Sequence, residues 1–167
     1  LNLMTDSWPA LALGVDKAEE DVMTRKPRNP KESFFKGLKG FMAVTGILGT
    51  VAVLGMFIWG WQAYGVEKGR TIALTTIIIF ELCRAYSCKN AKPFGPLFSN
   101  RWLNVAVLLS LALQILIMYT PLNIAFKLVP LGWSEWWIIL LVGSTGFFVL
   151  EIWKLIIARK KATEDLL

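Results

Sequence analysis

Three oxygen-bearing side chains stand together near the start of the chain, inside an otherwise apolar stretch. They are the amide of Asn2, the hydroxyl of Thr5 and the carboxylate of Asp6, and Pro9 follows them. On a helix these three positions share one face. Because Pro9 has no N–H, the carbonyl of Thr5 loses its helical donor, and we expect the helix to open near Thr5 and Asp6. An opened helix beside an intramembrane carboxylate is one way to build a cation site.

A simpler interpretation of the same stretch needs no ion. A proline-kinked helix could place Asp6 against a polar partner and do nothing else. Ionisable side chains at membrane depth are costly and tend to be functional. The residues of this stretch leave both interpretations open.

A second carboxylate, Glu81, lies in the middle third of another apolar segment, and Arg84 follows one turn later. A pair between these two side chains is the structural explanation. However, an Asp at the centre of a membrane helix costs about 2.5–3.5 kcal/mol, so buried carboxylates are usually kept for ions or protons. We therefore favour Glu81 as a cation ligand, which can converge with Asp6 if their helices pack together.

The four candidate ligands, Asn2, Thr5, Asp6 and Glu81, carry only hard oxygen atoms. Such ligands suit Ca²⁺ better than Zn²⁺ or copper. Ca²⁺ takes roughly 6–8 oxygens, and these side chains cannot complete two such sites. The freed carbonyl of Thr5 could add one more ligand.

Composition places the chain in a membrane. It is 55% hydrophobic, with a mean hydropathy of +0.53, which is too apolar for a soluble domain. The net charge of +6 comes from basic residues between the apolar segments, where the positive-inside rule puts them, so nucleic acid is a poor partner. The chain has no His, and Cys83 and Cys88 are spaced unfavourably for a disulfide or a metal pair.

The hydrophobic pattern predicts an all-α, polytopic transmembrane helix bundle made of half a helix and four spans. Residues 1–14 are too short to cross a membrane, so we expect them to be the second half of an unwound helix in a longer protein. Loops rich in Lys and Arg should face the cytoplasm. The remaining predicted segments are a cytoplasmic loop at 15–40, transmembrane helices at 41–64, 71–87, 102–119 and 134–157, external connections at 65–70 and 120–133, a cytoplasmic loop at 88–101 and a cytoplasmic tail at 158–167.

Other small and polar residues in the predicted spans are assigned to packing rather than chemistry. Small residues four apart allow helix backbones to approach closely, and amides hydrogen-bond between helices. A carboxylate and a lysine three residues apart can pair. The residues interpreted in this way are Thr45, Gly46, Gly49, Thr50, Asn104, Gln114 and the pair of Glu151 and Lys154.

The first thirty residues carry the pattern N-x-x-T-D, then P-A-x-A-L-G, then an acidic run leading to D-x-M-x-R-x-P-R. This pattern resembles the sixth transmembrane helix and the following loop of P-type calcium ATPases of the sarco/endoplasmic-reticulum type. The rest of the chain is similar to helices seven to ten, including E-x-C-x-A around Glu81. The short 65–70 connection departs from animal members, which have a long cysteine-containing loop there, and favours a prokaryotic-like member.

The resemblance implies specific roles. Asp6 would bridge two transported Ca²⁺ ions, Thr5 and Glu81 would bind one of them, and Asn2 the other. The 15–40 loop would lie against the phosphorylation domain. The partners would be the missing N-terminal helices and cytoplasmic domains of the same pump, together with membrane lipid. The protein would reside in the plasma membrane if prokaryotic, and otherwise in an endoplasmic reticulum-type membrane.

The chain has no catalytic motif of its own. It lacks D-K-T-G-T, T-G-E, G-D-G-x-N-D and any glycine-rich phosphate cradle, so Mg-ATP would bind elsewhere in the parent pump and this segment alone would be inactive. Two other functions stay open at this point. One is a related P-type proton or monovalent-cation pump, and the other is a standalone structural or chaperone-type membrane subunit.

Overall fold

The computed structural model describes residues 2–17, 23, 38–90 and 92–164, without the side chains of residue 2 and of residues 160–164. This part of the chain is helical and contains no strand, as predicted. Its elements are α1 (Asn2–Gly14), α2 (Lys39–Tyr64), α3 (Val66–Lys89), the short 3₁₀ helix η2 (Leu97–Ser99), α4 (Arg101–Tyr119), α5 (Leu122–Phe126) and α6 (Trp133–Glu164).

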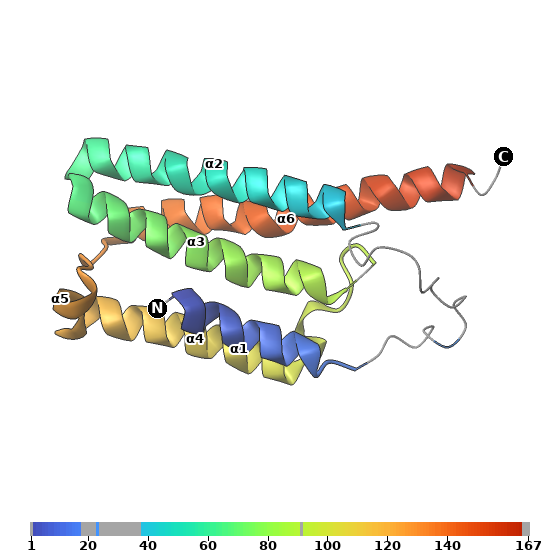
Figure 1. Ribbon diagram of the computed structural model, residues 1–167, viewed down its shortest axis with the longest axis horizontal. Helices are drawn as coiled ribbons and strands as arrows, with labels where there is room; N and C mark the ends of the chain where they lie inside the picture. Colours follow the sequence, from blue (N-terminus) through green and yellow to red (C-terminus); the bar gives the residue numbers. More distant parts are fainter. Residues whose placement is uncertain (1, 18–22, 24–37, 91, 165–167) are drawn as a thin grey trace.

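Four of the described helices are long and apolar enough to cross a membrane, which confirms the predicted number of spans. They are α2, α3, α4 and the Trp133–Arg159 part of α6. α1 reaches only about halfway along the bundle (Figure 1). The chain is therefore a multi-pass membrane protein.

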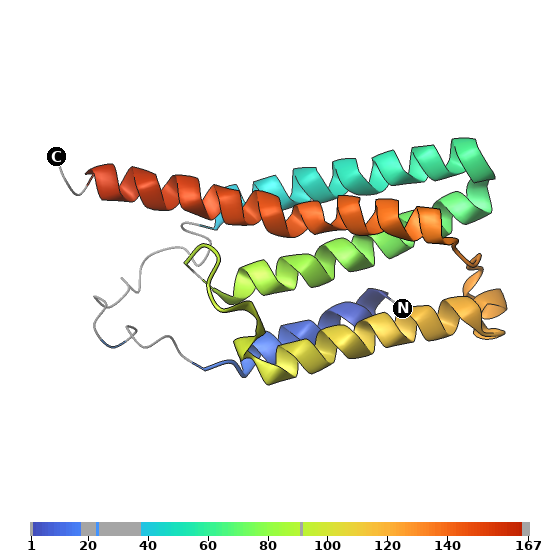
Figure 2. The same cartoon turned by 180° about the vertical axis from the view of Figure 1, so that it is seen from behind.

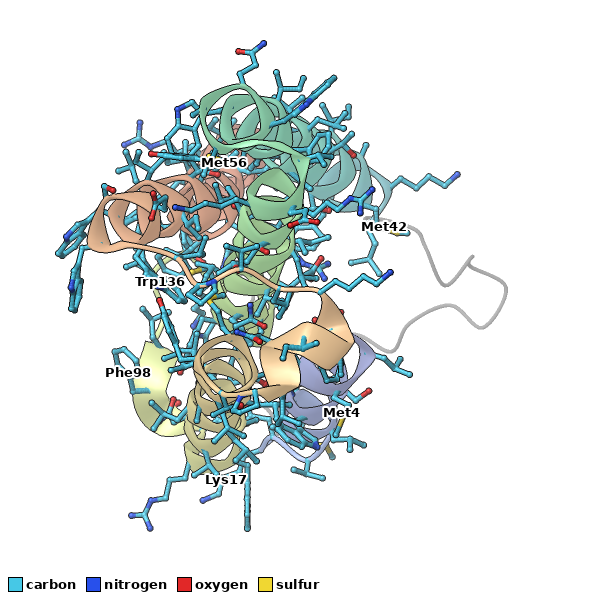
Figure 3. The ribbon with its side chains drawn as sticks, turned by 90° about the vertical axis from the view of Figure 1, so that its left-hand side faces the viewer. Met4, Lys17, Met42, Met56, Phe98 and Trp136 are labelled. Atoms are coloured by element: carbon cyan, nitrogen blue, oxygen red, sulfur yellow. The ribbon has the colours of Figure 1, made fainter. Side chains whose placement is uncertain are left out.

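α3 lies at the centre of the bundle. α2 and α6 pack on one side of it, and α1 and α4 on the other (Figures 1 and 3). In the most apolar stretch of α3, 56% of the residues are buried, against 11% for α2. Because α2 is apolar all around yet hardly covered, its outer face is suited to lipid.

Two buried clusters hold the helices together. One joins α1, α3 and α4 through Ala12, Leu82 and Leu103. The other joins α3 to α2 and α6 through Met56, Ile72 and Ile139, and Met118 of α4 belongs to it as well. All of these side chains are nearly inaccessible, so α3 contributes to both clusters and fixes the two halves of the bundle relative to each other.

The connection predicted at 65–70 is wrong, because α3 begins at Val66. Gly65 alone reverses the chain, with a φ of 91° that side chains rarely adopt. A Cβ placed on Gly69 would lie 2.8 Å from the backbone nitrogen of Trp61, so a glycine is needed for α2 and α3 to meet so closely. Lys68, in the first turn of α3, pairs through its ammonium with Glu135 at 3.0 Å.

Other predicted boundaries also move. The connection at 120–133 contains α5, and α6 continues to Glu164, so the tail predicted from residue 158 begins as helix. α2 starts at Lys39, inside the predicted 15–40 loop. Most of that loop lies outside the described residues.

Two predictions about packing are confirmed and one is half right. Gln114 donates to the Thr75 hydroxyl at 3.1 Å, and Asn104 accepts from the Tyr86 hydroxyl at 3.1 Å. These bonds join α4 to α3. Gly49 faces Phe80 of α3, but nothing lies within 4 Å of a Cβ on Gly46, so only the Thr45–Gly49 face of α2 packs.

The loop after α3 is fastened at the same end of the bundle as the end of α1 (Figure 2). Glu151 of α6 accepts from the Ser87 hydroxyl at 2.8 Å and from the Phe94 amide at 2.6 Å. Its carboxylate also pairs with Lys154 at 2.6 Å, as predicted. Lys154 in turn donates to the carbonyls of Ser87 and Asn90 at 3.0 and 3.1 Å.

Candidate cation site

The first helix does not open. α1 is helical from Asn2 to Gly14 with Pro9 inside it, so the prediction of an unwound helix is wrong. The carbonyl of Thr5 is nevertheless the one whose helical donor Pro9 removes. The hydroxyl of Ser110 on α4 donates to that carbonyl at 3.1 Å. A neighbouring helix thus supplies the missing donor, and α1 keeps its helical path.

A pocket of about 230 Å³ lies between α1 and α3. Thr5 and Asp6 line it from α1, and Glu81 and Arg84 line it from α3. Pro9 belongs to the same wall. The two carboxylates predicted to converge therefore share one cavity, because α1 packs directly on α3.

The electrostatics of this pocket are mixed. The carboxylate of Glu81 pairs with the guanidinium of Arg84, and their side chains are 23% and 35% exposed. This is the internal pair that the i, i+3 spacing allowed as the structural alternative to a ligand role for Glu81. Asp6 is only partly buried, whereas Thr5 is fully buried. Glu81 and Asp6 therefore keep access to the cavity, and Arg84 stands as a built-in counter-charge next to them.

The pocket holds part of a cation site at most. The side chain of Asn2 lies outside the described part of the structure, so its prediction is not tested. Among the described residues, no three Cys, His, Asp or Glu side chains cluster closely enough to hold a metal. Two carboxylates and one hydroxyl fall short of the roughly 6–8 oxygens that Ca²⁺ prefers.

The sequence interpretation missed two residues that position this pocket. Asn100 caps α4 by accepting from the Leu103 amide and donates to the Ala12 carbonyl of α1 at 2.9 Å. Ser110 holds the Thr5 carbonyl. A signal was present, because Asn100 and Ser110 each stand four residues before Asn104 and Gln114, the amides that bind α3.

Comparison with known proteins gives this arrangement its context. Residues 1–156 match the family described as cation transporting ATPase, C-terminus. The chain belongs to this family. The resemblance stated from the N-x-x-T-D and E-x-C-x-A motifs is thereby confirmed.

Relatives come from bacteria, plants and fungi. A calcium-transporting ATPase of Bacillus subtilis is 32% identical over 90% of this chain. An endoplasmic reticulum-type calcium-transporting ATPase of Arabidopsis thaliana is 28% identical over 92%, and an endoplasmic reticulum calcium ATPase of Aspergillus fumigatus is 26% identical over 92%. The chain spans about a fifth of the length of these relatives, 18% to 20%.

Proposed function

We propose that this chain forms part of the ion-binding transmembrane domain of an ATP-driven P-type pump that exports Ca²⁺ from the cytosol. The observation that carries the proposal is the shared pocket of α1 and α3, where Asp6 and Glu81 line one cavity. The names of the relatives support Ca²⁺ as the cargo. Hydrolysis of Mg-ATP would occur on domains that this chain does not contain.

In this proposal the ligands are Asn2, Thr5, Asp6 and Glu81. Asp6 contacts both transported ions, Thr5 and Glu81 serve one of them, and Asn2 serves the other. The remaining oxygens come from helices of the parent pump. When Ca²⁺ enters, the Glu81 carboxylate leaves the Arg84 guanidinium and binds the ion. This exchange of partners is possible because both side chains are partly exposed.

The bundle would brace this site against the lipid. α2 and α6 hold α3 from the side opposite to the pocket, and their exposed apolar faces would contact lipid acyl chains. The loop at 15–40 would lie in the cytoplasm, close to the phosphorylation domain. The Glu151 network would keep the end of α3 in place on that side.

ATP-dependent uptake of radioactive calcium tests the proposal. The complete protein that contains this chain is reconstituted into sealed vesicles, and uptake is measured with and without a calcium ionophore. We expect ATP-driven accumulation that the ionophore releases. Uptake of protons or monovalent cations in place of Ca²⁺ would assign the protein to a related pump, and the absence of any ATP-driven transport would favour a structural subunit.

Orientation is tested separately with single-cysteine variants in a background without Cys83 and Cys88. A cysteine at Lys17 or Lys92 should react with an impermeant reagent only after the membrane is opened, because Lys- and Arg-rich loops face the cytoplasm. A cysteine at Lys127 should react in intact cells. Labelling of position 17 in intact cells would overturn this topology.

A further inference from the structure

α4 contributes no carboxylate to the pocket, yet it is hydrogen-bonded to both helices that do. Its contacts come in two pairs along the helix. Asn100 and Ser110 donate to α1, at the carbonyls of Ala12 and Thr5. Asn104 and Gln114 bind α3, at Tyr86 and Thr75.

The carbonyls of Thr5 and Ala12 on α1 do not receive the usual helical hydrogen bond from the amide four residues later. Pro9 removes the amide that would serve Thr5. The amide of Asp16, which would serve Ala12, bonds to the carbonyl of Leu13 instead at 3.2 Å. A carbonyl left without a donor at membrane depth is costly, so α4 supplies donors where α1 needs them.

Of these contacts, the one between Ser110 and the Thr5 carbonyl lies next to Asp6 in the candidate cation site. Ser110 and Thr5 are both fully buried, and Asp6 is the next residue along the chain. Rotation or unwinding of α1 at Thr5 would move the Asp6 carboxylate relative to Glu81. A hydroxyl that fixes the Thr5 carbonyl therefore fixes the position of Asp6.

We propose that Ser110 is a positioning residue for the cation site, which replaces the backbone donor lost at Pro9 and holds Thr5 and Asp6 in their binding geometry. Ser110 acts through the carbonyl and does not itself touch the ion. This inference rests on the proposed function, because its effect is measured as cation affinity. It adds a residue on α4 to a site whose ligands lie on α1 and α3.

A matched pair of variants in the complete protein isolates the hydroxyl. Ser110→Thr keeps the donor, whereas Ser110→Val has the same shape without it. Equilibrium calcium binding should be close to wild type for Ser110→Thr and about ten-fold weaker for Ser110→Val, the size expected when one buried acceptor loses its donor. Ser144→Ala is the control, because the Ser144 hydroxyl is exposed and bonds within its own helix at 2.8 Å.

A double-variant cycle with Pro9→Ala distinguishes this role from general packing. Alanine at position 9 restores the backbone N–H, so the Thr5 carbonyl no longer depends on Ser110. We expect Ser110→Val to have little further effect on affinity in the Pro9→Ala background. An equal loss in both backgrounds, an unchanged affinity in Ser110→Val alone, or a tighter site would each overturn the proposal.

Hydrogen exchange of the peptide covering α1 gives a readout that needs no calcium. Ser110→Val should speed exchange in this peptide, while Ser110→Thr and Ser144→Ala should not. If wild type binds no Ca²⁺ but the exchange difference is present, the proposed function fails and the role of Ser110 in holding α1 stands. If wild type binds Ca²⁺ and neither readout responds to Ser110→Val, only the present inference fails.

Discussion

Glu81 and Glu151 have similar sequence surroundings, yet their carboxylates differ in exposure and in hydrogen-bond partners. Each stands in an apolar helix with a basic residue three positions later. Glu151 is 1% exposed and accepts from Ser87, Phe94 and Lys154. Glu81 is 23% exposed, pairs with Arg84 and lines the cavity beside Asp6. A carboxylate whose oxygens are already occupied by protein donors is structural, and one that opens onto a cavity remains able to bind an ion.

The reason for the difference lies in the neighbours rather than in the pair itself. Glu151 faces the end of α3, where a hydroxyl and an amide from the following loop point at it. Glu81 faces α1, which places a second carboxylate, that of Asp6, in the same cavity. A cation that enters this cavity would offset the repulsion between the two carboxylates.

Removal of the Asp6 charge should have the largest effect on the cavity that Asp6 and Glu81 line. Asp6→Asn should abolish all high-affinity calcium binding, a loss of at least about 100-fold, because carboxylate charge sets the affinity of calcium sites. The measurement is equilibrium binding of radioactive calcium to the complete protein. Asp16→Asn, two residues beyond the end of α1, is the matched control and should bind normally. Two intact sites in Asp6→Asn would remove Asp6 from the mechanism.

Substitution of Glu151, whose oxygens are bound by protein donors, should lower the stability of the fold and leave calcium binding intact. Glu151→Gln removes a buried charge and leaves the Lys154 ammonium without a carboxylate to balance it, which should cost about 3–5 kcal/mol of folding stability. Unfolding of the detergent-solubilised protein by heat or denaturant reports this loss. Calcium affinity of the folded fraction should be unchanged. A selective loss of calcium binding without destabilisation would show that Glu151 belongs to the site.

Glu81→Gln should have an intermediate and partial effect. It should weaken one calcium site by about ten-fold and leave the other measurable, since Glu81 reaches only one side of the cavity. A two-site binding isotherm, compared with that of Asp6→Asn, distinguishes the roles of the two residues. Equal and total loss in both variants would mean that they share a single ion or that the sites are strictly coupled.

Arg84→Gln should have the smallest effect, and in the opposite direction. Without the guanidinium, Glu81 no longer has to exchange a pair partner for the ion, so calcium should bind about two- to five-fold more tightly, as expected for a partly exposed ion pair. Calcium titration at low and high ionic strength checks this, because the gain should shrink with added salt. A weaker site in Arg84→Gln would show that the guanidinium orients Glu81 for binding.

Much of this protein follows from local sequence. The four spans are determined by apolar runs long enough to cross a bilayer, and the family by motifs around Asp6 and Glu81, because burial in lipid and ligand chemistry both depend on residue type and short-range spacing. The pairs Glu81–Arg84 and Glu151–Lys154 are likewise local, since residues three apart on a helix are neighbours.

Only the tertiary structure decided that α1 stays helical through Pro9 and that Glu81, rather than Glu151, lines a cavity. The sequence shows that Thr5 loses a donor, but the replacement comes from Ser110, more than one hundred residues later, and no local rule links the two. The Glu151 carboxylate also accepts hydrogen bonds from Ser87 on another helix and from Phe94 in a loop. Hydrogen bonds between distant segments are set by how the helices pack, and side-chain spacing along one helix does not determine that packing.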